Sequence, residues 1–510
     1  ELGNDWDREK NKLDDLLLDH KERRDRIAER REERRALRDR RAGINKRDDF
    51  DAWPSKRRDG SRTQKTEAQK DVERIIQHAR DDISTWVTQK KNEILNRVGG
   101  QDGTKLAKVF EKTFMNTIDT TVQATAEGRV FIITGDITAM WLRDSVPQVE
   151  HYLECCSERS RNVKEMLIRL VNEHAFLALQ DPYANAFYDP PQFKDTRADF
   201  RRGGYVSTGN YELDSFGYST RLAYKLWRKT GTISHFDEMF RSACRLMLVI
   251  WRKEQKHAAT TTYRYNPKEL KIKGIENSAS KYTGMTWTGF RPSDDPCTYH
   301  YNIPDNMLTS VALQQMYEIA TEVYNDHAWA EEAQSLQREI DNGIREHGIV
   351  DSRVGHIYAY EVDGFGKSLK EDDANVPSLL SIPYLNYTQA DKTVFDNTIK
   401  YIWSADNPWY FEGKHAEGIG SSHTGKRNIW HMSMIMKGII SKSGRERERI
   451  LRQCLDTDAG TDLMHESFNP NDPRRFTRKW FAWANSLFGY WVMQMLDEGT
   501  LPSSFKRKEE

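Results

Sequence analysis

The sequence predicts an all-α fold, with one large helical domain of roughly 400 residues behind a charged helical extension. Apolar residues recur at three- and four-residue steps through most of the chain after residue 66, a spacing typical of amphipathic helices. Strand-like runs are short and do not alternate with helices, which argues against a parallel-sheet fold. We find no repeat of constant period, although helices arriving in pairs would suit a toroid of paired helices.

Residues 1–65 are predicted to form a charged stalk and linker, and residues 66–510 the folded domain. Between residues 7 and 41, 25 of 35 residues are charged. Acids and bases alternate there at spacings that allow i to i+4 ion pairs along a helix with little to bury. A solvated helical or disordered stalk is favoured; a basic arm for an anionic partner, or for self-association, is the alternative. Gly43, Pro54 and Gly60 then indicate a linker.

Helices are predicted in order along the rest of the chain. Residues 72–98 carry regularly spaced apolar side chains and stop at Gly99-Gly100, which predicts a long amphipathic helix. The same periodicity predicts helices over residues 105–118, 145–156, 161–179, 216–229, 235–253, 304–323, 327–345, 391–403, 426–441, 445–455 and 479–497. Strand-like runs are limited to residues 130–133, 261–265 and a hairpin near 355–360.

Composition and charge exclude several classes of protein. The chain has 78 basic and 78 acidic residues, so its net charge gives no reason to expect nucleic acid as a partner. No apolar run reaches about 18 residues, so no transmembrane segment is expected. The five cysteines are scattered, which disfavours a disulfide framework or a paired metal site, and most are expected to be buried thiols. No signal-peptide pattern is seen, and the single sequon at Asn386 is weak support for secretion, so cytoplasmic and secretory locations both stay open.

A first cluster of acids and aromatics lies between residues 134 and 144, after a strand-like run. Asp136, Trp141, Arg143 and Asp144 occur there, just before a helix whose start includes Pro147. The structural alternative is that Asp144 caps that helix and Arg143 pairs with Asp136. The functional alternative is a sugar site, because carboxylates accept from hydroxyls, guanidinium groups donate to them, and tryptophan offers an apolar face.

The second cluster is Tyr211-Glu-Leu-Asp-Ser215, which leads from a glycine-rich loop into the next helix. Glu212 and Asp214 reach one pocket if the segment is extended and diverge if it is helical. Either residue could instead be an acid at a helix N-terminus, where the dipole favours it.

The third cluster, Met464-His-Glu-Ser-Phe468, precedes an aromatic stretch that enters the last helix. His465 and Glu466 have no second histidine at zinc-binding spacing, which disfavours a metalloprotease. Trp480 and Trp483 lie about one helical turn apart, so at least one of them is expected in the core.

A fourth segment, residues 284–295, combines Trp287, Arg291, Asp294 and Asp295. Burying these charges without partners would cost several kcal/mol each. We therefore expect this segment to line either a pocket or the solvent rather than the core.

Taken together, these acids suit the hydrolysis of a glycosidic bond. That reaction needs an acid to protonate the departing oxygen and a carboxylate on the anomeric side. The acid must keep its proton near neutrality, which requires burial or a neighbouring anion to raise its pKa. Sequence physics alone does not rank Asp214 above Glu212 for that role.

The motifs resemble those of glycoside hydrolase family 125, whose members are exo-acting α-1,6-mannosidases. The resemblance runs from about residue 68 to 495 with the motifs in order, and it does not cover the stalk. Its carriers are Thr134-Gly-Asp136 with Trp141-Leu-Arg-Asp-Ser145, Tyr211-Glu-Leu-Asp-Ser215, Gly284-Met-Thr-Trp287 with Gly289-Phe-Arg-Pro-Ser-Asp-Asp295, and Met464-His-Glu-Ser-Phe468 with Trp480-Phe-Ala-Trp-Ala-Asn485.

This resemblance implies an (α/α)6 barrel with a pocket at one end, a mannose-containing glycan as substrate, and inversion of configuration without a metal or other cofactor. By position, Asp214 matches the family's general acid and Glu466 its general base. Substrate contacts are expected from Asp136, Trp141, Arg143, Asp144, Glu212, Trp287, Arg291, Asp294, Asp295, His465, Trp483 and Asn485. The alternatives are another carbohydrase with a helical barrel, such as an inverting glucosidase or a polysaccharide lyase, and a non-catalytic glycan-binding scaffold.

Overall fold

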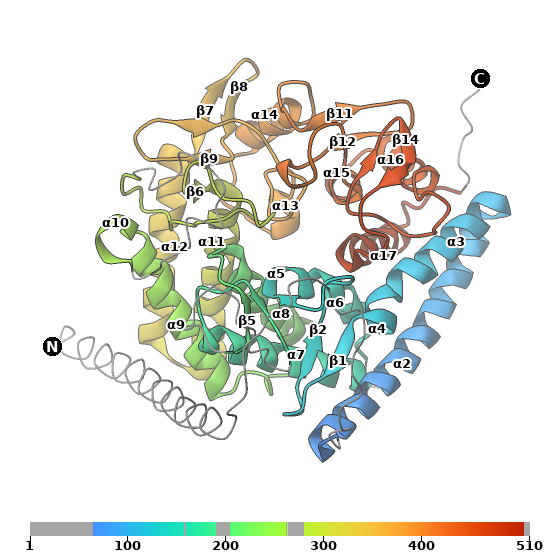
Figure 1. Ribbon diagram of the computed structural model, residues 1–510, viewed down its shortest axis with the longest axis horizontal. Helices are drawn as coiled ribbons and strands as arrows, with labels where there is room; N and C mark the ends of the chain where they lie inside the picture. The colour runs from blue at the N-terminus through green and yellow to red at the C-terminus, as the bar shows by residue number, and fades with distance from the viewer. Residues whose placement is uncertain (1–64, 158–159, 190–203, 262, 264–279, 504–510) are drawn as a thin grey trace, which may run out of the picture. The chain divides into compact units, whose positions relative to one another are not determined.

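A computed structural model describes residues 65–157, 160–189, 204–261, 263 and 280–503. The chain separates into two units, Glu1–Gln64 and Lys65–Glu510. The predicted stalk therefore lies outside the described residues, as does most of the predicted strand at 261–265. The second unit is mostly helical, which confirms the predicted fold class (Figure 1).

Helices make up most of this unit, and the longest of them match the predicted ranges closely. In chain order they are α2 (Glu67–Val98), α3 (Gly100–Phe114), α4 (Asn116–Thr120), α5 (Leu142–Ser145), α6 (Pro147–Glu150), the 3-10 helix η1 (His151–Cys155), α7 (Arg161–Gln180), α8 (Asp214–Thr230), α9 (Glu238–Glu254), α10 (His257–Thr260), α11 (Ile303–Ile319), the π-helix η2 (Ala320–Tyr324), α12 (His327–His347), α13 (Ile382–Leu385), α14 (Lys392–Ile402), the 3-10 helix η3 (Ser422–Thr424), α15 (His431–Ile440), α16 (Gly444–Asp456) and α17 (Ala482–Asp497).

The strands are short and pair in small antiparallel sheets. They are β1 (Val122–Ala124), β2 (Val130–Ile132), β3 (Met140–Trp141), β4 (Ala186–Phe187), β5 (Val206–Thr208), β6 (Tyr301–Asn302), β7 (Ile349–Ser352), β8 (Gly355–Tyr358), β9 (Glu361–Val362), β10 (Ser368–Leu369), β11 (Tyr410–Glu412), β12 (Glu417–Ile419), β13 (Phe468–Asn469) and β14 (Asp472–Phe476). The predicted hairpin near 355–360 is confirmed as β7–β8, although its first strand begins at Ile349.

Side-chain caps fix where many helices begin. A cap oxygen accepts a backbone N–H of the first turn, which satisfies a donor that the helix leaves without a partner. The residues that cap in this way are Thr66, Asp237, Asn302, Asp326, Asp391 and Ser443. The helix predicted over 426–441 begins later, at His431, because Arg427 has a left-handed backbone and Ile429 pairs with Phe468.

A series of helix contacts closes on itself around the core. Along the chain α5 packs on α8, α8 on α11, α11 on α13, α13 on α15 and α15 on α17, while α17 returns to α6. The helices α11 and α17 are buried on nearly all sides, as expected for helices surrounded by others. The remaining long helices, such as α7 on α8 and α12 on α11, pack outside this series.

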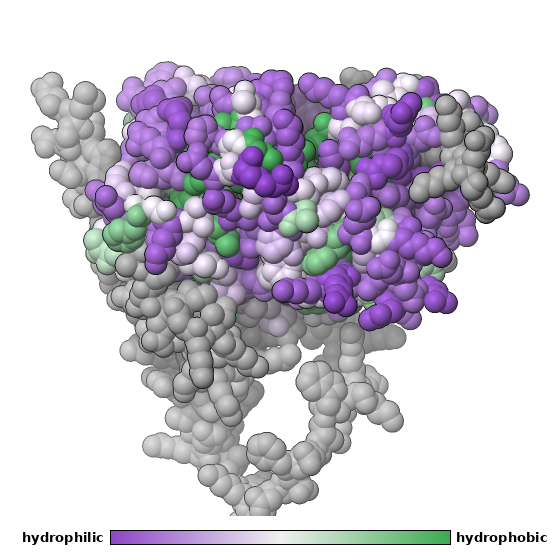
Figure 2. Space-filling view, turned by 90° about the horizontal axis from the view of Figure 1, so that it is seen from above, coloured by the Kyte–Doolittle hydropathy of each residue, from purple (hydrophilic) through white to green (hydrophobic). Residues whose placement is uncertain are grey.

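The surface seen in Figure 2 is mainly hydrophilic, with small apolar areas between charged side chains. No helix among the described residues combines the length and apolarity needed to cross a bilayer. All five cysteines are free thiols and four of them are buried, which confirms the prediction made for them.

Candidate active site

The four predicted clusters meet through backbone contacts between distant segments. Gly135 pairs with Phe481, which joins the first cluster to the third, and Glu212 pairs with Phe290, which joins the second to the fourth. Gly135 has a φ of 127°, and a Cβ there would lie 2.7 Å from the carbonyl oxygen of Trp480. Only glycine allows this approach.

Four buried or half-buried carboxylates surround the guanidinium of Arg143. Its nitrogens lie 2.6 Å from Glu212, 3.2 Å from Asp144, 3.5 Å from Asp294 and 3.6 Å from Asp214. We call these five residues the acid cluster. Glu212 precedes α8 and Asp214 is its first residue, so the turn into the helix lets both side chains reach one guanidinium.

Burial in the acid cluster opposes ionisation. Removal from water, strengthened by nearby Asp144 and Asp294, raises the pKa of Asp214 to about 7, against the lowering effect of Arg143. Burial, with Asp294 nearby, also raises the pKa of Asp144 to about 6. Neither oxygen of Asp214 accepts a hydrogen bond from a described residue. A buried carboxyl that keeps its proton near neutrality is what a general acid requires.

Asn185 contacts the acid cluster, although it was not predicted from the sequence. Its amide donates to Glu212 and to Asp294, each at 2.8 Å, while its carbonyl oxygen accepts from Thr208. Strand β4 begins at the next residue and pairs with β3, which brings Asn185 beside Trp141. The indole of Trp141 donates to Asp294 at 2.8 Å.

Glu466 lies just before β13, and the residues that contact its carboxylate lie just after β14. Thr477 donates to Oε2 at 2.9 Å, and Arg478 lies 3.5 Å from Oε1. Both follow β14, whose Phe476 pairs with Phe468. Thr477 and Arg478 therefore hold the carboxylate of Glu466 in one orientation through two donors.

Arg478 links Glu466 to the first cluster. Its Nε donates to Asp136 at 2.9 Å, and its charge also acts on Asp144. The acid cluster and Glu466 are therefore connected through two arginines, Arg143 and Arg478, with Asp144 between them.

A second residue missed from the sequence is His423, in η3. Its Nδ1 lies 3.4 Å from Asp295, whose other oxygen accepts from Ser422 at 2.6 Å. The imidazole also feels the charges of Asp294 and Glu466. The carboxylate that His423 contacts directly is that of Asp295.

Residues 103–493 match the family model of the metal-independent α-mannosidases. The chain belongs to glycoside hydrolase family 125. The resemblance drawn from its motifs is thus confirmed, and the chain is a glycosidase of the α-mannosidase class.

Two relatives support this family 125 assignment. A solved structure from Streptococcus pneumoniae, described as a metal-independent α-mannosidase in a non-productive substrate complex with α-1,6-mannobiose, is 38% identical. It covers 81% of this chain and 98% of its own, with a TM-score of 0.76. The meiotically up-regulated gene 157 protein of Schizosaccharomyces pombe is 35% identical over 445 residues, which cover 81% of this chain and 86% of that protein.

A more distant likeness concerns the fold alone. A bacterial glucoamylase complexed with acarbose is 12% identical, with a TM-score of 0.51 over 79% of this chain and 57% of its own. Among the described residues of this family 125 member, no group of three or more His, Cys, Asp or Glu is arranged to hold a metal ion.

The burial of Arg291 contradicts one expectation for the family 125 site. We expected its segment to line a pocket or solvent, but Arg291 is only 5% exposed. It has partners that the sequence did not reveal, Glu361 at 2.6 Å and Glu371 at 3.2 Å. Burial is tolerated because the charge is paired, so the segment enters the core at Arg291 and emerges at Asp294 and Asp295.

Trp287 stacks on histidine rings rather than on residues of the acid cluster. It is 2% exposed and stacks on His257 at 3.5 Å and on His300 at 4.6 Å. Its ring faces are thus covered by imidazoles, which favours a supporting role behind the second cluster. A direct contact of Trp287 with sugar stays a prediction.

Three other predicted residues support the segment that carries Glu466. Asn485 accepts from the backbone N–H of Met464 at 2.9 Å. His465 is buried, and burial lowers its pKa, so its imidazole is neutral. It forms a hydrogen bond with the carbonyl oxygen of Arg478 and places no positive charge beside Glu466. Trp483 is in the core, as expected for one of the two tryptophans, against Tyr218.

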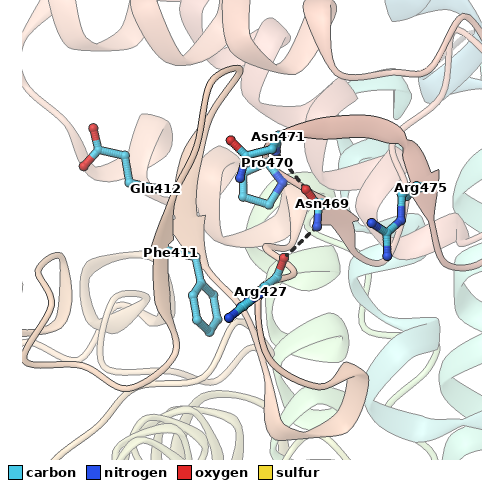
Figure 3. A pocket seen from close by; sticks show the side chains of 7 residues that line it. All are labelled: Phe411, Glu412, Arg427, Asn469, Pro470, Asn471 and Arg475. Carbon is cyan, nitrogen blue, oxygen red and sulfur yellow. Dashed lines mark hydrogen bonds between the residues drawn. The ribbon is translucent and has the colours of Figure 1, made fainter.

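A cavity of about 450 Å³ lies beside the same hairpin but holds none of the predicted site residues. Figure 3 shows Phe411 and Arg475 on opposite sides of the turn formed by Pro470 and Asn471. Its remaining lining residues are Glu412, Arg427 and Asn469. The predicted site residues therefore lie outside this cavity.

Proposed function

We propose that the protein removes terminal α-1,6-linked mannose from glycans with inversion of configuration, using Asp214 as general acid and Glu466 as general base. Residues 66–510 form the catalytic domain, and the closed series of helix contacts supports a six-pair (α/α)6 barrel.

The contrast between the two carboxylates supports this assignment most directly. Burial raises the pKa of Asp214 to about 7, so this group is largely protonated below neutrality. Glu466 instead contacts Thr477 and Arg478, which stabilise a negative charge. Pairs of titratable groups whose environments differ in this way mark acid and base roles.

In the proposed reaction Asp214 donates its proton to the glycosidic oxygen as the bond to the anomeric carbon breaks. Glu466 accepts a proton from a water, whose oxygen forms the new bond at the opposite face of the sugar. The product is β-mannose, Asp214 regains a proton from solvent, and Glu466 releases to solvent the proton that it accepted. Inversion requires the two carboxyl groups to be about 6.5 to 9.5 Å apart, which leaves room for that water.

The acid cluster supplies the groups that hold the sugar. Arg143 donates, while Asp144 and Asp294 accept, a combination that recognises neighbouring hydroxyls. The α-1,6 linkage is proposed because the Streptococcus pneumoniae relative is described in complex with α-1,6-mannobiose.

The test is incubation of the protein with α-1,6-, α-1,2- and α-1,3-linked mannobiose, with proton NMR following the anomer released first. We expect hydrolysis of the α-1,6 isomer with β-mannose as the initial product. Initial α-mannose would overturn inversion, and preference for another isomer would overturn the linkage. An unsaturated product absorbing in the ultraviolet would indicate a lyase, and binding without hydrolysis a scaffold.

A further inference from the structure

His423 lies on a short helix whose side chains contact Asp295, the residue that follows Asp294 of the acid cluster. The helix η3 follows β12 and precedes α15. The backbone N–H of His423 donates to Ser421 at 3.1 Å, and Ser421 in turn donates to Asp373 at 2.7 Å. The side chain is 42% exposed, so the ring is anchored at one edge and accessible at the other.

The anchored edge is Nδ1, which faces Asp295 at 3.4 Å. Ser422 holds the second oxygen of that carboxylate, so the orientation of Asp295 is fixed from two sides. Among the described residues, no hydrogen bond to Nε2 of His423 is present. The imidazole therefore has one donor position available for a ligand.

The surroundings of His423 are acidic. Asp295, as hydrogen-bond partner and charge, raises the pKa of His423 to about 9, with smaller contributions from Asp294 and Glu466, against the lowering effect of burial. The ring is therefore an imidazolium across the neutral range, and its charge is lost only as the pH rises through about 9.

We propose that His423 is a substrate-binding residue, whose Nε2–H donates a hydrogen bond to a hydroxyl of the terminal mannose while Asp295 positions the ring. This proposal rests on the proposed function and extends it to a residue outside the family motifs. Because Asp295 directly follows Asp294 of the acid cluster, the contact of His423 with Asp295 brings its ring to the sugar that this cluster is proposed to hold. A charged donor forms a stronger hydrogen bond to a hydroxyl than a neutral one does.

The first experiment compares His423→Gln with a matched control, His356→Gln. His356 is also paired with an aspartate, at 3.0 Å from Asp351, but it lies on β8 and is 70% exposed. Calorimetry measures mannose binding, and steady-state kinetics measure kcat and KM for α-1,6-mannobiose. We expect His423→Gln to weaken mannose binding about 10- to 100-fold and the control to leave it unchanged.

The second experiment asks whether Asp295 acts through the charge of His423. In Asp295→Asn the pKa of His423 falls back toward its ordinary value of 6.5, so mannose affinity should decrease between pH 6 and pH 8. The double variant Asp295→Asn with His423→Gln should lack that additional pH dependence. The original protein should keep the contribution of His423 up to about pH 9.

These outcomes separate the two proposals. If the original protein hydrolyses α-1,6-mannobiose but His423→Gln binds mannose as tightly as His356→Gln, the role of His423 is wrong and the proposed function stands. If the original protein hydrolyses no mannobiose yet His423→Gln alone loses mannose binding, the proposed function is wrong and the sugar contact stands. Absence of mannose binding in the original protein would overturn both.

Discussion

Arg143 is the residue around which the candidate site is organised. One guanidinium lies within 4 Å of four carboxylates, so the negative charge in the cluster exceeds the positive charge if all four ionise. The surplus is relieved by protonation, which is why burial and neighbouring acids raise the pKa values of Asp144, Glu212 and Asp214 together. The same crowding that opposes ionisation supplies a proton for catalysis.

Replacing either proposed catalytic carboxylate should abolish turnover without unfolding the chain. Asp214→Asn removes the transferable proton and Glu466→Gln removes the acceptor, so each should lower kcat by at least about 100-fold. Initial rates on α-1,6-mannobiose and circular dichroism test this. The exposed controls Asp351→Asn and Glu412→Gln should retain activity, and near-normal turnover in Asp214→Asn would remove that residue from the mechanism.

The pH dependence should follow the protonation of Asp214. A general acid is active in its protonated form, so kcat/KM should fall as the pH rises through about 7. Asp144→Asn removes one of the charges that raise this pKa and should move the alkaline limb to lower pH. The measurement is kcat/KM between pH 5 and pH 9. A limb that stays in place in the variant would show that Asp144 does not act on the acid.

Residues recognised from the sequence were those that occur in groups. Asp214 and Glu466 attracted attention because each lies among other acids and aromatics, but their roles as acid and base came from the family resemblance. Asn185 and His423 lie outside these groups. Arg478 lies in the aromatic stretch after the third cluster, but its contact with Glu466 depends on the pairing of β13 with β14, which the sequence did not predict. Such contacts between distant segments leave little trace in local spacing.

At the level of elements, long helices were predictable, whereas most short strands were not, apart from β2 and the hairpin of β7 and β8. The helix α2 ends at Val98, as its apolar periodicity and the following glycines predicted. Strands of two or three residues, such as β3 and β4, are too short for an alternating pattern to appear. Yet the pairing of β3 with β4 places Asn185 beside the acid cluster, so these short strands position the site more than their length suggests.

The contact between α15 and α17 should be sensitive to one methyl group. A Cβ on Gly438 would lie 2.2 Å from the ring of Trp491, so Gly438→Ala forces the indole to move. We expect a loss of about 1 to 3 kcal/mol in the free energy of unfolding, measured by denaturant titration. Gly444→Ala is the matched control, because nothing lies within 4 Å of its Cβ position. Equal stability of both variants would refute this packing.

At the scale of the whole molecule, the acid cluster should reduce stability near neutral pH. A carboxyl whose pKa is raised on folding contributes stability below the unfolded pKa and loses it as the pH rises through the folded pKa. For Asp214 this window runs from about 4 to about 7. Activity and stability therefore make opposite demands on this side chain.

The stability of Asp214→Asn, relative to the original protein, should increase with pH. The variant carries no charge to bury, so its advantage should grow by about 1 to 3 kcal/mol between pH 4 and pH 8. Thermal unfolding at both pH values measures the change, and comparison within each variant cancels the packing effect of the amide. A constant difference between the two proteins would show that Asp214 is not destabilised by burial.

The return of α17 to α6 has a consequence for synthesis of the chain. Both proposed catalytic residues have left the ribosome before α17 does, yet Asn485 and Phe481 on this last segment hold the backbone near Glu466 and Gly135. With a premature stop codon just after residue 480, Asp214 and Glu466 would still be synthesised, but the segment that holds the backbone around the site would be missing. Truncation there is therefore expected to act as a complete loss rather than a partial one.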